Sequence, residues 1–175
     1  MAKRIAILAT DGFEQSELMK PRAILKDAGY AADVVSPKYD EIRGWKEKGW
    51  GDTVAVDVVL ADESADDYDA LVLPGGVINP DQLRMQPAAV AFVKAFDADR
   101  KPLAANCHGP WMLAESGAAT GRTVTSWPSL RTDLSNAGAT WKDAEVVTDG
   151  HVITSRKPDD IPAFANAVME TVGSP

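Results

Sequence analysis

Short, mainly apolar runs alternate along this chain with segments that carry apolar side chains at helical spacing. The runs at residues 3–10, 70–73 and 101–105 are typical of strands buried in a parallel sheet. Segments 14–28 and 86–99 have an apolar side, as amphipathic helices do. Because alternating strands and helices form an open, mostly parallel sheet covered on both faces, the sequence predicts an α/β fold of this kind.

The remaining segments complete this alternation. The other predicted elements are, in chain order, extended segments at 31–36 and 53–60, a loop or hairpin between them at 43–52, helices at 110–116 and 130–136, an extended segment at 122–126, a hairpin of 144–148 with 152–155, and a final helix that begins at Asp159 or Asp160 and ends near Val172. Asp149-Gly150 is a strong signal for the turn of that second hairpin. An Asp before the final helix is a suitable N-cap.

The composition bounds the kind of protein. The chain has 175 residues, and we expect a single domain over residues 1–175. With 26 acidic and 18 basic residues the formal net charge is −8, which argues against a nucleic-acid groove and against docking on an anionic membrane. No run of about twenty apolar residues predicts a membrane span. The single Cys rules out an intramolecular disulfide and suits a reducing compartment, so we expect a cytoplasmic location.

Three segments follow predicted strands and are candidates for the functional site: residues 11–17, 74–84 and 106–111. In open parallel α/β sheets the ligand site lies beyond the carboxyl ends of the strands. We therefore expect these segments, although distant in sequence, to meet at one edge of the sheet.

Cys107 is the first candidate for chemistry at this edge, since it stands where an apolar strand ends and a helix begins. Such a turn is similar to the nucleophile elbow, which raises a side chain above the sheet. A helix N-terminus carries partial positive charge, which would make the thiol easier to deprotonate. A lone Cys is more often a small buried hydrophobe, but the adjoining His108 and the Gly-Gly loop favour the nucleophile.

His108 has two functional interpretations, as general base for the thiol or as donor of its backbone N–H to an oxyanion. The structural alternative is a histidine that only packs at the turn. His151 follows the Asp149-Gly150 turn and is expected to lie away from the site. The four Cys or His ligands of a closed zinc site are missing. Neither a phosphate loop nor G-x-G-x-x-G after the first strand is present. We therefore expect no metal and no cofactor.

Glu14 is the carboxyl that we expect to hydrogen-bond the Cys107 sulfur. It must then be protonated when the sulfur is a thiolate, because two adjacent negative charges repel. Glu17, one turn on, is interpreted as an ordinary helix residue. The Pro-Gly-Gly at 74–76 permits a backbone whose N–H faces a reacting carbonyl. The position of Asp81, taken alone, indicates a turn or helix-cap residue.

With these residues in place, the chain resembles the PfpI-type intracellular protease family. That family belongs to the superfamily of the parkinsonism-associated protein deglycase and is akin to class I glutamine amidotransferases. The segments that carry the resemblance are DGFEQSEL (11–18), DALVLPGG (69–76), NPDQLR (79–84), KPLAANCHGPW (101–111), DAEVVTDG (143–150) and SR (155–156). The order FE, LPGG, CHGP is specific as a combination.

The resemblance implies a flavodoxin-like three-layer α/β sandwich that forms a homodimer or a larger assembly. It implies Cys107 as nucleophile with Glu14 in contact with its sulfur, and the backbone N–H groups of Gly76 and His108 as the oxyanion hole. The acid that orients His108 would come from a neighbouring subunit, at the position of Asp81. The family residue there is a Glu, and the loop of this chain is one residue longer.

The activities implied by the resemblance are peptide hydrolysis, cofactor-free conversion of methylglyoxal to lactate, and deglycation of methylglyoxal adducts. We expect a stress-related cysteine-dependent hydrolase that acts on such adducts, as a deglycase or glyoxalase, or on peptides. The alternatives from other classes are an oxidation sensor or chaperone-like stress protein that uses the same cysteine without turnover, and a non-catalytic α/β subunit. Trp45 and Trp50 either line a substrate entrance or, as we favour, pack as ordinary aromatics.

Overall fold

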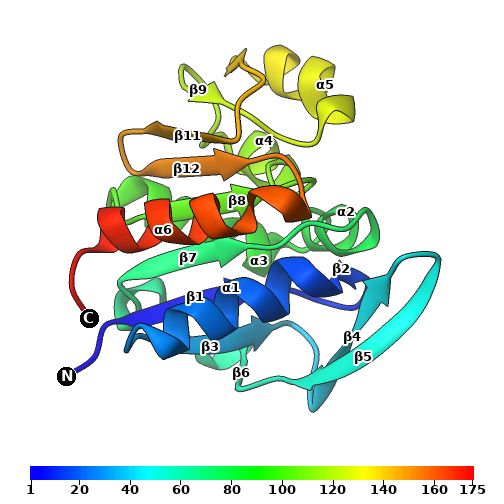
Figure 1. The fold of residues 1–175 in the computed structure, drawn as a ribbon, viewed down its shortest axis with the longest axis vertical. Helices are drawn as coiled ribbons and strands as arrows, with labels where there is room; N and C mark the ends of the chain where they lie inside the picture. The colour runs from blue at the N-terminus through cyan, green and yellow to red at the C-terminus, as the bar shows by residue number, and fades with distance from the viewer.

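The structure, a computed structural model that describes residues 1–175, is built around a seven-stranded sheet in the order β11-β12-β8-β7-β1-β3-β6 (Figure 1). Its strands are β1 (Arg4–Leu8), β3 (Ala31–Ser36), β6 (Val58–Val59), β7 (Ala70–Leu73), β8 (Leu103–Asn106), β11 (Val146–Asp149) and β12 (Val152–Ser155). Neighbouring strands are parallel except β11 and β12, which form the hairpin predicted at Asp149-Gly150. The predicted, mostly parallel sheet is confirmed.

Helices cover both faces of this sheet (Figure 1). They are α1 (Gln15–Asp27), α2 (Ile78–Leu83), α3 (Pro87–Ala98), α4 (Trp111–Ser116), α5 (Arg131–Asn136) and α6 (Ile161–Val172). Helices α1 and α6 pack on one apolar cluster, and α3 and α4 pack on the other. Ile5 and Ile7 of β1 enter the first cluster while Ala6 and Leu8 enter the second, which is why a strand buried on both faces has a continuous apolar sequence. The predicted three-layer sandwich is confirmed. None of the helices combines the length and apolar character needed to cross a membrane.

Two smaller sheets lie beside the main one. The first consists of β2 (Phe13–Glu14), β4 (Glu41–Lys46) and β5 (Gly49–Ala55), and the second of β9 (Thr123–Val124) and β10 (Thr140–Trp141); short 3-10 turns occupy Leu60–Asp62, Ala65–Asp67, Pro128–Leu130 and Pro158–Asp160. The β4–β5 hairpin is one of the two forms predicted for residues 43–52. Glu14 pairs with Trp45 in the adjacent strand, so α1 begins at Gln15 and not at Glu14 as the sequence predicted. This pairing holds the hairpin near the carboxyl edge of the main sheet (Figure 1).

Asp160 directly precedes α6, as predicted, but its carboxylate does not cap the helix. It is buried and accepts hydrogen bonds from Arg156 instead, at 3.0 Å from Nε and 3.1 Å from the backbone N–H. Arg156 also pairs with Asp143 at 2.9 Å. Because a carboxylate prefers a guanidinium fork to a single helix N–H, the loop after β12 is tied to the start of α6 by this pair.

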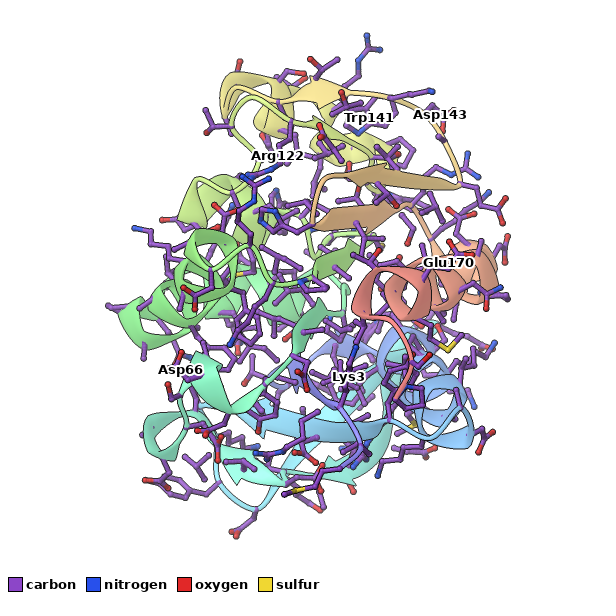
Figure 2. All side chains as sticks on the ribbon, turned by 90° about the vertical axis from the view of Figure 1, so that its left-hand side faces the viewer. Lys3, Asp66, Arg122, Trp141, Asp143 and Glu170 are labelled. Carbon is purple, nitrogen blue, oxygen red and sulfur yellow. The ribbon has the colours of Figure 1, made fainter.

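His151 lies at the opposite edge of the sheet from Cys107, as predicted. Its carbonyl accepts the N–H of Leu103, the first residue of β8, whereas Cys107 follows the last residue of that strand. Its Nε2 is 2.8 Å from Oδ1 of Asp97, which Nη2 of Arg122 (labelled in Figure 2) also contacts at 3.1 Å. The imidazole is therefore used in a structural network between α3 and the β12 edge.

Asp97→Ala is expected to lower the free energy of unfolding by about 2 kcal/mol, because it leaves the buried His151 without its acceptor. Urea unfolding measures this loss, and the alkylation rate of Cys107 should stay unchanged. Asp99→Ala is the matched control, since Asp99 is an exposed carboxylate just beyond the end of the same helix. If both variants lost the same free energy of unfolding, the cause would be the removal of a negative charge at the end of α3 and not the loss of the contact with His151.

Candidate active site

A pocket of about 300 Å³ opens at the carboxyl edge of the sheet, where the segments after β1, β7 and β8 meet. Its walls are formed by Glu14, Glu17, Trp45, Glu47, Gly76, Val77, Cys107, His108, Trp127 and Pro158. The structure thus brings together Cys107, His108, Glu14 and Gly76, whose catalytic roles stay predictions. No three His, Cys, Asp or Glu side chains are grouped so as to hold a metal ion.

Cys107 follows the last residue of β8 in a left-handed backbone conformation, with a φ of +58°. For a residue other than Gly this conformation is strained by about 1–3 kcal/mol, so the surroundings must hold it. Its N–H donates to the Ser155 carbonyl at 3.0 Å, and its own carbonyl accepts the Trp127 N–H at 2.9 Å. Gly109 allows the tight turn that follows, because a Cβ there would lie 2.4 Å from the Leu73 carbonyl oxygen. The predicted elbow is therefore present, and it fixes the position of the sulfur.

The carboxyl that contacts the Cys107 side chain belongs to Glu17 and not to Glu14. Glu17 is fully buried, adjoins the cysteine side chain closely enough to raise the pKa of its thiol, and accepts the Gly75 N–H through Oε1 at 3.1 Å. Glu14 is half-buried, and its Oε1 accepts the Ser16 hydroxyl at 3.1 Å. The prediction fails because Glu14 lies in β2, so that the first turn of α1 directs Glu17 toward the sheet. The interpretation of Glu17 as an ordinary helix residue is therefore wrong.

Burial controls the charge of this pair. Burial and, secondly, the charge of Glu14 raise the pKa of Glu17 to about 8, so its carboxyl is mostly protonated at neutral pH. Burial also raises the pKa of the Cys107 thiol, and an ionised Glu17 raises it further. The predicted lowering of this pKa is wrong, because burial dominates and α4 begins only at Trp111. At neutral pH both groups are therefore mostly protonated, and the thiol must give its proton to an acceptor before the sulfur can attack.

Two backbone N–H groups, those of Gly76 and His108, hydrogen-bond the Cys107 sulfur and act to lower its pKa. Neither N–H donates to a backbone carbonyl of the fold. Gly76 reaches this position with a φ of +80°, where a Cβ would lie 2.5 Å from the Gly12 carbonyl oxygen. Such donors stabilise negative charge on the sulfur or on an oxygen bound next to it. Their assignment as an oxyanion hole stays a prediction.

The His108 imidazole adjoins the sulfur, with Nδ1 3.2 Å from Sγ of Cys107. The ring stacks on Trp127 with centroids 6.2 Å apart, and it meets Trp111 nearly edge-on at 5.2 Å. Burial lowers the pKa of His108, so the imidazole is neutral at neutral pH. A neutral ring nitrogen accepts a proton from a thiol, and both functional interpretations of His108 stay open.

Asp81 lies on α2 outside the pocket, with about half of its side chain exposed. Its Oδ1 is 3.0 Å from Nη2 of Arg84, and Arg84 stacks over the Trp111 ring at 4.6 Å. Within one chain Asp81 therefore pairs with Arg84 and does not reach His108. Its contact with His108 across subunits stays a prediction.

Trp127, Glu47 and Pro158 also line the pocket, although the sequence did not single them out as site residues. They lie in irregular or turn segments, where no periodicity or motif distinguishes them. Trp45 lines the pocket, which is the less favoured of its two interpretations, whereas Trp50 lies outside and packs edge-on against Trp45. The only feature of the sequence that indicated this part of the pocket was the pair of Trp in a Gly-rich hairpin.

Known proteins with related sequences match this chain over almost its whole length. A profile of the DJ-1/PfpI family matches residues 3–171. "General stress protein 18" of Bacillus subtilis is 44% identical over 94% of this chain and 94% of its own length. "Putative cysteine protease YraA" of the same organism is 42% identical over 94% of this chain and 95% of its own. A deglycase of Thermococcus kodakarensis is 42% identical over 92% and 94%.

Solved structures agree with the sequence comparisons. The crystal structure of Drosophila melanogaster DJ-1beta matches with a TM-score of 0.89 and 27% identity, covering 99% of this chain and 92% of that one. The family resemblance read from the FE, LPGG and CHGP motifs is thereby confirmed. By sequence and by fold, the chain belongs to the DJ-1/PfpI family.

Proposed function

We propose that this chain is a cysteine-dependent enzyme that breaks down methylglyoxal-type adducts and releases the carried group and lactate. The observation that supports this is the position of the Cys107 sulfur, at a strained elbow between the neutral Glu17 carboxyl and the N–H groups of Gly76 and His108. A sulfur nucleophile, a proton donor and N–H groups together meet the needs of addition to a carbonyl. Relatives named as a deglycase and as a cysteine protease support an enzyme of the hydrolase type.

In the proposed reaction, Sγ of Cys107 attacks the former aldehyde carbon of the adduct. The S–C bond forms while the carried amine or thiol leaves with a proton, and Glu17 and His108 transfer the protons. A proton moves from this carbon to the neighbouring ketone carbon, and the hydroxyl proton moves to the ketone oxygen, which gives a lactoyl thioester. Water then hydrolyses the thioester to lactate and restores the thiol, so no electron acceptor is consumed.

Peptides are the other substrate class that the same groups would serve. The pocket of about 300 Å³ suits a small adduct better than an extended chain. We also propose a homodimer or larger assembly in which Asp81 of one subunit approaches His108 of the next, since Asp81 is half exposed. A cytoplasmic location completes the proposal, because the single Cys is free and its reactivity depends on a reduced state.

An oxidation sensor or chaperone-like stress protein is the second candidate function. The protonated Glu17 and the two N–H groups would donate hydrogen bonds to a sulfinate, the product of adding two oxygen atoms to Sγ. The relative named as a general stress protein supports this candidate. Mass spectrometry after mild peroxide treatment tests it, and an unmodified Cys107 at doses that oxidise free thiols contradicts it.

The enzymatic proposal is tested with the hemithioacetal that methylglyoxal forms with 2-mercaptoethanol. We expect the purified protein to release lactate faster than its Cys107→Ser variant, which supplies the background rate. Equal rates for the two proteins would overturn the proposal.

A further inference from the structure

The pocket above Cys107 has an acidic rim. Glu14 and Glu47 line it, and no Lys or Arg does. Glu47 is exposed and Glu14 is half-buried, and neither takes part in an ion pair. Lys46 and Lys48 flank Glu47 and Lys157 precedes Pro158, but none of the three lines the pocket. Because Glu17 is mostly neutral, Glu14 and Glu47 are the charged side chains that directly face a bound group.

Two indole rings stand beside these carboxylates. Trp45 and Trp127 both line the pocket, and Trp127 is 40% exposed. The face of a Trp ring attracts an ammonium or guanidinium group placed over it. Carboxylates next to Trp faces are therefore suited to a cationic group and unsuited to an anionic one.

Hydrogen bonds hold this rim in a fixed relation to the sulfur. The Trp45 indole N–H donates to the Glu47 carbonyl at 3.2 Å across the hairpin turn. Glu14 stands opposite Trp45 in the β2–β4 pairing. The Trp127 N–H donates to the carbonyl of Cys107 itself. The backbone that carries these carboxylates and rings is thus held at the mouth of the pocket.

The floor of the pocket offers an independent sign of a polar ligand. Oε2 of Glu17 is buried and has no N–H or hydroxyl partner in the fold, although Glu17 lines the pocket. A buried oxygen of this kind is normally hydrogen-bonded. The hydroxyl group of a methylglyoxal adduct is a suitable partner for it.

We infer that the pocket selects carbonyl adducts that are carried by cationic groups and disfavours anionic ones. Glu14 and Glu47 are the charge-selecting residues, and Trp45 and Trp127 provide the faces for the cation. This inference rests on the proposed function and adds to it the charge class of the substrate.

Three small thiols of different charge test this inference. Methylglyoxal forms hemithioacetals with thiocholine, whose quaternary ammonium group is cationic and cannot condense with the carbonyl, with 2-mercaptoethanol, which is neutral, and with 3-mercaptopropionate, which is anionic. We expect kcat/KM for lactate release to fall in that order, by about tenfold between the first and the last at low salt. At 0.5 M NaCl the ratio should approach one, because salt screens exposed charges.

Charge-removing variants identify the residues responsible. Glu47→Gln and Glu14→Gln should each lower the cationic-to-anionic ratio of kcat/KM by about threefold. Glu41→Gln is the matched control, since Glu41 is an exposed carboxylate at the other end of the same hairpin and does not line the pocket. It should keep the wild-type ratio.

The outcomes separate the inference from the function on which it rests. Turnover of all three adducts with equal kcat/KM would overturn the charge selection and leave the enzymatic proposal standing. A ratio that falls as much in Glu41→Gln as in Glu47→Gln would show that net charge acts and not the rim. No turnover of any adduct would overturn both.

Discussion

Glu17→Gln is expected to lower the turnover of methylglyoxal adducts by about a thousandfold, the usual range for loss of a positioned acid–base group. Gln has nearly the shape of Glu, and its amide oxygen still accepts the Gly75 N–H. It carries no exchangeable acid proton, so it cannot protonate the leaving group or take up a proton from the sulfur. Lactate release under saturating adduct measures the effect, and a loss below tenfold would show that Glu17 does not transfer protons.

The same substitution is expected to stabilise the fold at alkaline pH. The pKa of Glu17 rises from its ordinary 4.5 to about 8 on folding, so between these values the folded chain binds the proton more tightly than the unfolded chain does. This contribution to stability is fully present below the lower value and is lost as the pH rises through the higher one. A Gln avoids the loss, and we expect a gain on the order of 3 kcal/mol at pH 9.

Thermal or urea unfolding between pH 5 and pH 9 tests this gain. The difference between Glu17→Gln and the wild type should be small at pH 5 and should grow with pH. Glu41→Gln is the matched control, because its carboxyl is exposed and is not among the charges that act on Glu17. A pH-independent difference for Glu17→Gln would contradict the burial argument.

Gly76→Ala is expected to destabilise the fold by about 3 kcal/mol or more and to abolish turnover. Its φ of +80° strains any other residue, and a Cβ would lie 2.5 Å from the Gly12 carbonyl oxygen and 2.6 Å from the Glu14 nitrogen. Both of these are backbone atoms, so β2 and the loop after β7 must separate. The N–H that points at the Cys107 sulfur would move with that loop.

Gly150→Ala is the control for this second prediction. Gly150 also has a positive φ, +62°, but a Cβ there meets nothing within 4 Å. It should therefore cost only backbone strain, about 1 kcal/mol, and should leave turnover intact. Urea unfolding together with lactate release compares the two variants, and equal destabilisation would show that the steric conflict at Gly76 is relieved without cost.

The layers of this fold could be predicted because strands that are buried on both faces have short, continuous apolar sequences. Runs such as residues 70–73 are apolar on both faces, and the β11–β12 turn follows from a single Asp-Gly pair. The start of α1 could not be predicted so closely. Glu14 and Glu17 are both acceptable in a first helical turn, and only the pairing of Glu14 with Trp45, far away in sequence, removes it from the helix.

The candidate site was predictable to the same extent. Cys107, His108 and Gly76 follow strands, and their position at the sheet edge is a property of parallel α/β topology. The pKa of Cys107 was not predictable, because burial depends on how Glu17, Gly75 and the adjoining loops close over the sulfur. Trp127 reaches the pocket through its backbone hydrogen bond to the elbow and its stacking on His108, which are contacts distant in sequence.

The contact between Glu17 and Cys107 has a consequence for where the reacting proton is stored. Once the pair has lost one proton, it bears a single negative charge whether the remaining proton sits on oxygen or on sulfur. Shuttling that proton from Sγ to the carboxyl leaves the total charge of the buried site constant. The thiolate can therefore form by proton transfer within the site, and no ion has to enter the low-dielectric pocket from solvent.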